Sequence, residues 1–457
     1  MVLKRRADSD NAPGVGLVRN AVQSRTSQGR ALRVLIASHS HPSITRGGAE
    51  VAAFRLFEKL CELPDYEAWF LGCQTGTSGG RLGVAISQPF SAREFIYNIG
   101  EFDSFKFANR DTNFPEDFCG LLRELQPDVI HFHHFTHFGV EAFFHARTTL
   151  PDAKIVLTFH EFLAVCHRYG QMVTHPDDHL CYEATPQHCN RCFPEISQAD
   201  FFLRKLYIQS FFKYVDNFIT PSYFLAQRLR DWGIPSERLT VIENLTPTPE
   251  QGSVRRVRQK HDPLRVGFFG QLSRLKGINV LLDAAKMLED DGVNDITFEI
   301  HGHYRGQPLE FQVEMQERIK DLGRNVRCHG AYDPARTDRL MRGVGVTIVP
   351  SIWWENSPVV IQEAFRNRRP VICSDIGGMS EKVRDGMDGW HFPVGNAAAL
   401  AALLKRLADE PGAVQAISES MQFPGSFQEV LDAHIEIYSK KAGTLLTDVE
   451  VRSKAGF

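Results

Sequence analysis

The chain has 457 residues, about three times the size of a common domain, so two domains are expected. The 52 Lys and Arg residues against 55 Asp and Glu residues give a net charge of −3, which excludes a strongly basic nucleic-acid-binding protein. Hydrophobic residues make up 43% of the chain, too many for a disordered protein. We find no membrane-spanning run of about 18 apolar residues and no secretory signal, so we expect a cytoplasmic protein with reduced cysteines.

Short apolar runs alternate with helical patterns through the first half of the chain. Residues 1–30 lack periodicity and predict a disordered arm. The run 32–37 predicts a buried strand, and the apolar residues between Ala49 and Leu60 share one helical face after a glycine-bearing turn. The same pattern predicts a helix at 118–125 and buried strands at 129–132, 154–159, 217–220 and 239–244.

The pattern restarts after a polar, proline-bearing segment, 248–263, which predicts a linker. Strands are expected at 264–269, 296–300, 344–349 and 371–374, and helices from Ile278, at 359–365 and at 427–438. This alternation predicts an α/β fold class with two doubly wound, Rossmann-like parallel-sheet domains facing a central cleft. We place the domains at 31–247 and 264–420, and a C-terminal segment, 421–445, whose helix returns toward the first domain.

Ligands of such sheets bind where strands end and helices begin, so we examine these turns first. In the second domain the turn 269–277 lacks both common phosphate-loop patterns but places Gly270, Arg274 and Lys276 before a helix N-terminus. Free backbone amides and the positive end of the helix dipole favour an anion there, and Lys276 adds a point charge. The alternative is a solvated turn.

A second candidate loop follows the strand at 344–349. Ser357 suits a helix N-cap and Pro358 a first helical turn, which puts Glu355 in the loop and Glu363 in the second turn of the helix. Both carboxylates can then approach one ligand, with the free amides of residues 357–360 between them. For a lone Glu363, a solvated helix position is the simpler interpretation.

Together these motifs resemble the retaining nucleotide-sugar glycosyltransferases of family 4, which have the GT-B fold. The resemblance spans residues 31 to about 440. It is carried by the E-x7-E pair Glu355 and Glu363 and by segments 47–50, 127–133, 158–161, 216–222 and 375–378.

The resemblance implies a role for each matching residue. Glu355 lies near the donor sugar hydroxyls, Glu363 binds the ribose, Lys276 holds the diphosphate, and His160 faces the reacting sugar. These implications give His160, Lys276 and Glu355 as catalytic residues. The implied donor-binding set is Gly47, Gly48, Gly270, Gln271, Arg274, Lys276, Gly302, Glu355, Asn356, Ser357, Pro358, Val359 and Glu363. Acceptor binding is assigned to His131, His133 and Glu161.

The chain departs from the family at one position, because Gln271 stands where the family carries a diphosphate arginine. Arg274 or Arg46 is our candidate replacement. Catalysis is expected to be electrostatic and to need no metal cofactor, since Lys276, a helix N-terminus and backbone amides stabilise the leaving phosphate. We see no carboxylate nucleophile, which favours transfer on the same face of the sugar.

Four cysteines, Cys166, Cys181, Cys189 and Cys192, fall within a Cys/His-rich loop at 160–195. The Cys189-x2-Cys192 spacing is typical of a zinc site, and the other two thiols complete a tetrahedral set. A structural zinc and a group of reduced thiols remain equally weighted alternatives.

The aromatic and basic segment 201–214 predicts a helix that either packs under the sheet, which we prefer, or contacts a membrane surface. The expected partners are therefore a nucleoside diphosphate sugar and a glycan or lipid-linked acceptor, without nucleic acid. We expect a retaining glycosyltransferase of cell-surface polysaccharide biosynthesis. A GT-B nucleotide-sugar epimerase and a non-catalytic nucleotide-sugar-binding scaffold are the alternatives.

Overall fold

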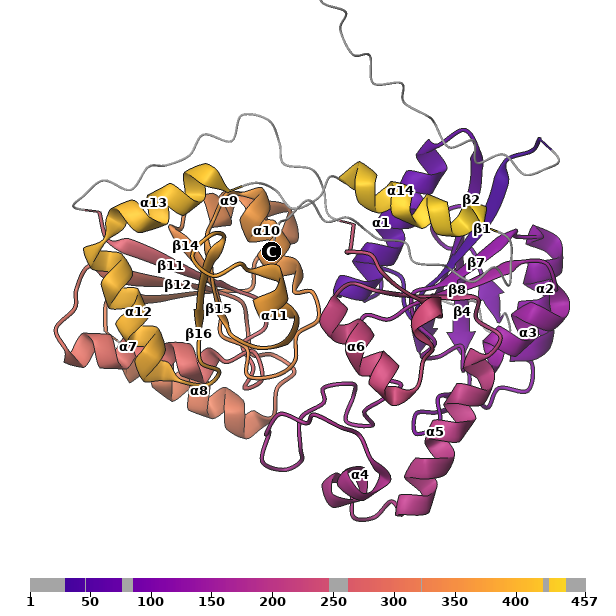
Figure 1. Ribbon diagram of the computed structural model, residues 1–457, viewed down its shortest axis with the longest axis horizontal. Helices are drawn as coiled ribbons and strands as arrows, with labels where there is room; N and C mark the ends of the chain where they lie inside the picture. The colour runs from indigo at the N-terminus through magenta and orange to yellow at the C-terminus, as the bar shows by residue number, and fades with distance from the viewer. Residues whose placement is uncertain are drawn as a thin grey trace, which may run out of the picture.

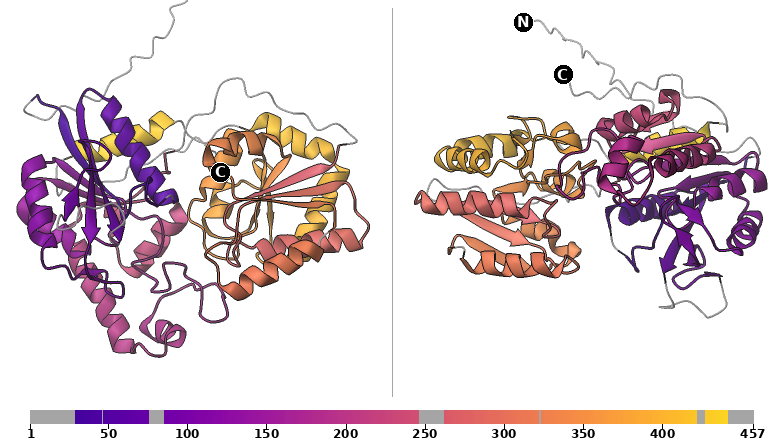
Figure 2. Two further views of the ribbon diagram at one scale, coloured as in Figure 1. Left: turned by 180° about the vertical axis from the view of Figure 1, so that it is seen from behind. Right: turned by 90° about the horizontal axis from the view of Figure 1, so that it is seen from below.

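The computed structural model describes residues 29–45, 47–75, 85–245, 262–321, 323–421 and 427–440. The described chain forms two lobes that lie side by side, each built on a largely parallel sheet covered by helices (Figure 1, Figure 2). The expected fold class is confirmed. Most of the expected arm at 1–30 and of the expected linker at 248–263 lies outside the described residues.

The N-terminal lobe is organised around one eight-stranded sheet in the order β10-β9-β8-β7-β1-β2-β4-β3. Strand β3 pairs antiparallel with β4, and the other neighbours are parallel. The strands are β1 Leu32–Ala37, β2 Tyr66–Thr75, β3 Ile86–Ser87, β4 Glu94–Ile99, β7 Val129–Phe132, β8 Lys154–Thr158, β9 Asn217–Thr220 and β10 Leu239–Val241, with a separate pair β5 Phe102–Asp103 and β6 Ala108–Asn109. The helices are α1 Gly48–Glu62, α2 Phe114–Leu125, α3 Glu141–Thr149, α4 Pro186–Cys192, α5 Gln198–Phe212, α6 Tyr223–Trp232 and the short η1 Ser236–Arg238.

Strand β1 shows why both faces of this sheet are apolar. Successive side chains of a strand point to opposite faces. Val34 and Ile36 therefore pack in one core cluster with residues of α1, while Leu35 and Ala37 pack in the other with residues of α2 and α3. Burial on both faces explains the near-continuous apolar run that the sequence shows at this strand.

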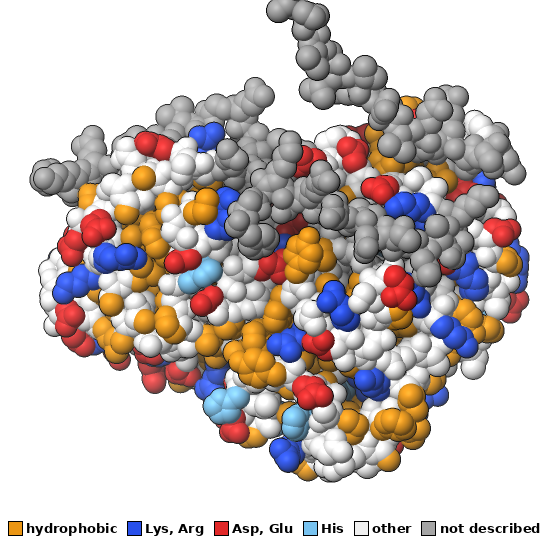
Figure 3. Space-filling view, in the orientation of Figure 1, with side chains coloured by type: hydrophobic (Ala, Val, Ile, Leu, Met, Phe, Trp, Pro, Cys, Tyr) orange, Lys and Arg blue, Asp and Glu red, His pale blue; other side chains and the backbone are white. Residues whose placement is uncertain are grey.

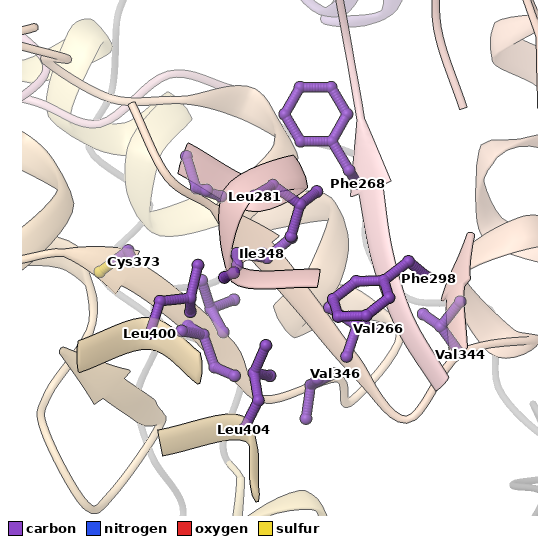
Figure 4. Packing of buried hydrophobic residues seen from close by; sticks show 14 of the residues in the cluster. Val266, Phe268, Leu281, Phe298, Val344, Val346, Ile348, Cys373, Leu400 and Leu404 are labelled. Atoms are coloured by element: carbon purple, nitrogen blue, oxygen red, sulfur yellow. The ribbon is translucent and has the colours of Figure 1, made fainter. Parts of the chain in front are cut away.

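The C-terminal lobe holds a six-stranded parallel sheet in the order β13-β12-β11-β14-β15-β16. Its strands are β11 Leu264–Phe269, β12 Ile296–His301, β13 Val326–Gly330, β14 Val346–Val349, β15 Val371–Ser374 and β16 Gly389–Phe392. Its helices are α7 Ile278–Asp290, α8 Leu309–Asp321, η2 Pro334–Arg336, α9 Thr337–Arg342, α10 Val359–Arg366, α11 Gly377–Lys382, α12 Ala397–Asp409 and α13 Pro411–Ser420. Leu281 of α7 and Leu404 of α12 pack with Val266 and Ile348 of the sheet in one core cluster (Figure 4).

Helix α14, Phe427–Ser439, lies beside α1 against the N-terminal lobe (Figure 1, Figure 2). Its Tyr438 is buried, and the Tyr438 hydroxyl is 2.6 Å from Nδ1 of His131 on β7. The Nζ atom of Lys154 on β8 donates to the carbonyl oxygen of Lys440 at 2.9 Å. The C-terminal helix is therefore tied to the first sheet by polar as well as apolar contacts.

Some elements differ from the sequence-based expectation. Residues 66–75 and 94–99 form strands β2 and β4, which we did not predict. Helix α10 begins at Val359 with Pro358 as its N-cap residue, so the expectation that Ser357 caps this helix is wrong. The Ser357 hydroxyl instead donates to a carboxylate of the other lobe, a partner that local spacing does not reveal.

We predict that Tyr438→Phe destabilises the protein by about 1–3 kcal/mol, because it leaves Nδ1 of His131 buried without its hydroxyl partner. Urea unfolding followed by circular dichroism measures the change in the free energy of unfolding. Tyr223→Phe is the matched control, since Tyr223 is 58% exposed. Equal stability of the two variants would contradict the role assigned to this contact.

Candidate active site

The C-terminal sheet changes the direction of its strand order between β11 and β14. Strand β11 connects through α7 to β12 on one side, and β14 connects through α10 to β15 on the other. Ligands of open α/β sheets bind at such switch points, beyond the carboxyl ends of the strands. The turn after β11 and the loop after β14, residues 270–277 and 350–358, are the two predicted donor-binding segments, and they lie together here.

An ion pair joins these two segments. Nζ of Lys276 lies 2.6 Å from Oε1 of Glu355, whose side chain is 8% exposed. The same Oε1 accepts the Ser351 hydroxyl at 2.9 Å and the Trp353 indole N–H at 3.0 Å. None of these three bonds uses Oε2 of Glu355, so that oxygen remains available to accept a ligand hydroxyl.

Two glycines allow the loops to pack closely enough for this pair. Gly277 has a φ of +71°, and a Cβ at this position would lie 1.8 Å from the carbonyl oxygen of Pro350. Gly378 donates its backbone N–H to the carbonyl oxygen of Glu355, and a Cβ there would lie 1.8 Å from the carbonyl oxygen of Asn356. Any side chain at either position would push the 350–358 loop out of place.

The two carboxylates of the E-x7-E pair have different surroundings. Glu355 is bonded to Lys276, whereas the carboxylate oxygens of Glu363 take part in no hydrogen bond among the described residues. Burial raises the pKa of Glu363, and Arg366 and Arg55 oppose the rise. The Glu363 carboxylate on α10 is thus poorly solvated and can accept hydrogen bonds from a ligand.

The remaining donor-site candidates lie around the same strand ends. A Cβ at Gly302 would lie 1.7 Å from the carbonyl oxygen of Gly270, so the ends of β11 and β12 touch. Gln271 is exposed. Arg274 is 61% exposed and lies 3.8 Å from Asp178 of the N-terminal lobe, while Arg46 lies outside the described residues.

The N-terminal sheet has its own switch point, between β1 and β7. Acidic and imidazole side chains pair beyond these strand ends. His39 lies 3.0 Å from Glu50 at the start of α1, and His134 lies 2.6 Å from Glu161. Burial alone would raise the pKa of Glu161, but His134 and the nearby His160 hold it at about 2. The strand ends of the N-terminal sheet therefore carry an ionised carboxylate at Glu161.

His160 lies in the loop after β8. Its Nε2 is 3.2 Å from Nδ1 of His133, and the two rings stack with centroids 5.4 Å apart. Burial lowers the pKa of His160 to about 4, so the ring is neutral at pH 7. Its backbone carbonyl oxygen accepts a hydrogen bond from Nδ2 of Asn356 at 3.0 Å. This bond joins the loop after β8 to the donor-site loop, residues 350–358. A neutral ring at this position can polarise or position a hydroxyl group.

The three acceptor candidates do not share one environment. His131 is fully buried, with one ring nitrogen 2.6 Å from the Tyr438 hydroxyl and the other 2.7 Å from the Thr158 hydroxyl. Both ring nitrogens of His131 are thus occupied inside the lobe, and this geometry does not support direct contact of His131 with an acceptor. Nε2 of His133 is buried without a partner among the described residues, and 27% of the Glu161 side chain is exposed.

Contacts between the lobes hold the two walls together. A Cβ at Gly48 would lie 3.5 Å from Cγ2 of Val359, which places the start of α1 against the start of α10. The Trp354 indole donates to the carbonyl oxygen of Cys181 at 3.0 Å. Sequence reasoning missed Trp354, Glu243 and Lys382, because no local pattern indicates a partner in the other lobe.

The four predicted zinc ligands are free thiols, as are the other cysteines. Burial and, to a smaller extent, the neighbouring thiols of Cys166, Cys181 and Cys192 raise the pKa of Cys189 to about 12, so the four lie within electrostatic range of one another. Across the described residues, no three His, Cys, Asp or Glu side chains are arranged to hold a metal ion as they stand.

Comparisons with known proteins agree with this architecture. The family model described as Glycosyltransferase Family 4 matches residues 46–248, and the model described as Glycosyl transferases group 1 matches residues 252–422. The amylovoran biosynthesis glycosyltransferase AmsK of Erwinia amylovora is 28% identical over 181 residues, 38% of this chain and 43% of that protein. A lipopolysaccharide 1,2-N-acetylglucosaminetransferase of Salmonella typhimurium is 25% identical over 42% of this chain and 53% of that protein. The matched regions span about half the length of these curated relatives.

Solved structures share the fold. Anabaena HepE in complex with UDP superposes with a TM-score of 0.61 and 16% identity, over 89% of this chain and 99% of that chain. Sucrose-phosphate synthase from Thermosynechococcus elongatus has a TM-score of 0.60 and 17% identity, over 90% of this chain and 96% of that chain.

We predict that the protein loses stability as the pH falls from 6.5 toward 4. Burial lowers the pKa of His160 and of His434 to about 4, so between pH 6.5 and 4 the unfolded chain binds protons that the folded chain does not. Each such proton lowers the free energy of unfolding by about 1.4 kcal/mol per pH unit. Urea unfolding at pH 7, 6 and 5 measures the slope.

His434→Gln is the test of this assignment, because it removes one of these protons and should flatten the pH dependence. A wild-type stability that stays constant between pH 6.5 and 4.5 would show that these rings do not govern it.

Proposed function

The chain belongs to the family 4 glycosyltransferases, which have the GT-B fold, and we propose that it transfers a sugar from a nucleoside diphosphate donor in polysaccharide biosynthesis. The observation that carries the proposal is the Lys276–Glu355 pair at the switch point of the C-terminal sheet, beside the N-terminus of α10. A cation, free helix amides and a carboxylate lie together there, which is the chemistry that a sugar diphosphate requires.

The donor class rests on the site and on a structural neighbour. HepE was solved with UDP and with UDP-glucose. In this chain Lys276 and the α10 amides would stabilise the charge that develops on the leaving phosphate, and Glu355 and Glu363 would accept sugar and ribose hydroxyls. We propose that these groups carry the reaction without a metal cofactor and that the linkage is formed with retention.

The acceptor belongs to the N-terminal wall. His160 would face the reacting sugar, and His133 and Glu161 would contact the acceptor hydroxyl. Relatives named for amylovoran, lipopolysaccharide and colanic acid synthesis support a glycan or lipid-linked acceptor.

A membrane contact is part of the same proposal. No helix in the described part of the chain is both long and apolar enough to span a membrane. One face of α5 packs inward through Phe201, Ile208 and Phe212. Its other face exposes Phe202, Leu203 and Leu206, and hydrophobic side chains reach the surface near the lower part of α5 in Figure 3. This exposed face supports contact with a lipid surface.

We predict that Lys276→Met lowers turnover of the sugar nucleotide by about a hundredfold, since one oxyanion-stabilising donor contributes roughly 3–4 kcal/mol. A thermal-shift panel with UDP, GDP, ADP, TDP and CMP first selects the nucleotide, because a ligand that binds the folded state raises the melting temperature. Turnover is then measured with the matching sugar nucleotides by release of the nucleoside diphosphate.

Lys286→Met is the matched control, because Lys286 is an exposed lysine on the adjacent helix α7. Glu363→Ala should abolish the thermal shift of the selected nucleotide. Turnover of Lys276→Met within threefold of wild type, or no shift with any nucleotide, would refute the proposed site. Donor consumption that yields only an isomeric sugar nucleotide would favour an epimerase, and binding without turnover a scaffold.

We also propose that Cys166, Cys181, Cys189 and Cys192 bind a structural zinc ion. The pKa values of the Cys166, Cys181 and Cys189 thiols are raised, so zinc must displace the protons of these three thiols and draw the four side chains together. The loop they stabilise contacts the donor-site loop through the bond between Trp354 and the carbonyl of Cys181.

Purified wild-type protein is expected to contain about one zinc per chain by elemental analysis, since four thiolates complete a closed tetrahedral site. Cys189→Ser should lose the zinc, whereas Cys328→Ser, which alters an exposed cysteine elsewhere, should keep it. Wild-type protein free of zinc after growth in zinc-supplemented medium would establish that the thiols are simply reduced.

A further inference from the structure

Glu243 follows the last strand of the N-terminal sheet by two residues and reaches into the C-terminal lobe. Its Oε1 accepts the Ser357 hydroxyl at 2.6 Å, and its Oε2 lies 2.5 Å from Nζ of Lys382 on α11. The backbone N–H of Asn244 also donates to Oε1 at 2.8 Å. One carboxylate thus binds two elements of the other lobe while it is held by its own chain.

The hydrogen bond between Ser357 and Glu243 connects Glu243 to the proposed donor site. Ser357 stands between Glu355 and the start of α10, and its hydroxyl oxygen also accepts Nε2 of Gln362 at 3.1 Å. Because the single hydroxyl proton is donated to Glu243, the orientation of Ser357 depends on a residue of the N-terminal lobe. Movement of Glu243 would therefore move the segment that carries Glu355 and the α10 amides.

The contact between Glu243 and Lys382 is an ion pair that binds the two lobes to each other. Burial alone would lower the pKa of Lys382, but Glu243 and Glu381 raise it, so the ammonium is charged. Its Nζ also donates to the carbonyl oxygen of Pro221 at 2.7 Å. Glu381 accepts the backbone N–H groups of Tyr223 and Phe224 at the start of α6, at 3.0 and 2.8 Å. Paired, poorly solvated charges of this kind lose much stability when one partner is removed.

From these contacts we propose that Glu243 is a positioning residue that sets the donor-site loop against the acceptor wall, acting through Ser357 and Lys382. This inference rests on the proposed glycosyl transfer. The donor is bound by groups of the C-terminal lobe, whereas His160 belongs to the other lobe. Glu243 therefore governs the alignment of the two reactants more than the affinity for either.

The test compares Glu243→Gln with Glu237→Gln, which alters an exposed glutamate of η1, six residues earlier in the chain. Glu243→Gln keeps the size of the side chain and removes its charge. We expect kcat to fall about tenfold, as small misplacements of reacting groups do, with the Kd of the nucleoside diphosphate within twofold of wild type. Lys382→Met should give a similar loss, and the double variant should lose little more than either single variant. Small-angle scattering should show a larger radius of gyration for Glu243→Gln.

Three outcomes would overturn the proposal. If Glu243→Gln matches Glu237→Gln in both kcat and scattering, the contact positions nothing. Tighter donor binding by Glu243→Gln would mean that the carboxylate occupies the place of the donor phosphate. If wild-type protein turns over no sugar nucleotide, the proposed function fails, and an unchanged radius of gyration in Glu243→Gln then also refutes the positioning role.

Discussion

The candidate site depends on the ion pair between Lys276 and Glu355. These residues lie in different loops, after β11 and β14, and each loop is held by backbone packing that a side chain at Gly277 or Gly378 would prevent. Three donors converge on one oxygen of Glu355, so the orientation of the carboxylate is set before any ligand arrives. Such preorganisation is the main source of electrostatic stabilisation in enzymes, because no reorganisation is required during the reaction.

Three of the contacts between the lobes use backbone carbonyl groups of the N-terminal lobe. Asn356, Trp354 and Lys382 donate to the carbonyl oxygens of His160, Cys181 and Pro221, respectively. These acceptors lie in loops that follow β8 and β9, so the same strand ends that present His160 also fix the distance between the lobes. The alignment of the two lobes and the position of His160 consequently depend on one set of loops.

The sequence predicted the parts of this arrangement that depend on local burial. The apolar run of β1 and the face of α1 follow from the periodicity of buried residues, and the strand ends then indicate where ligand-binding loops lie. Ser357 was misplaced as a helix cap because its partner, Glu243, is 114 residues away along the chain. Tyr438, the partner of His131, likewise belongs to a helix 307 residues later in the chain. Long-range polar pairs leave no spacing pattern in the sequence.

The strand ends of the two lobes carry different charges. Burial keeps His133 and His160 neutral, and Glu50 and Glu161 have lowered pKa values because paired histidines outweigh the effect of burial. The acceptor wall is therefore neutral to acidic, whereas the opposite wall presents Lys276 and the N-terminus of α10. In the proposed reaction, the charge that develops on the leaving diphosphate would be stabilised by Lys276 and the N-terminus of α10, on the side away from the ionised Glu161.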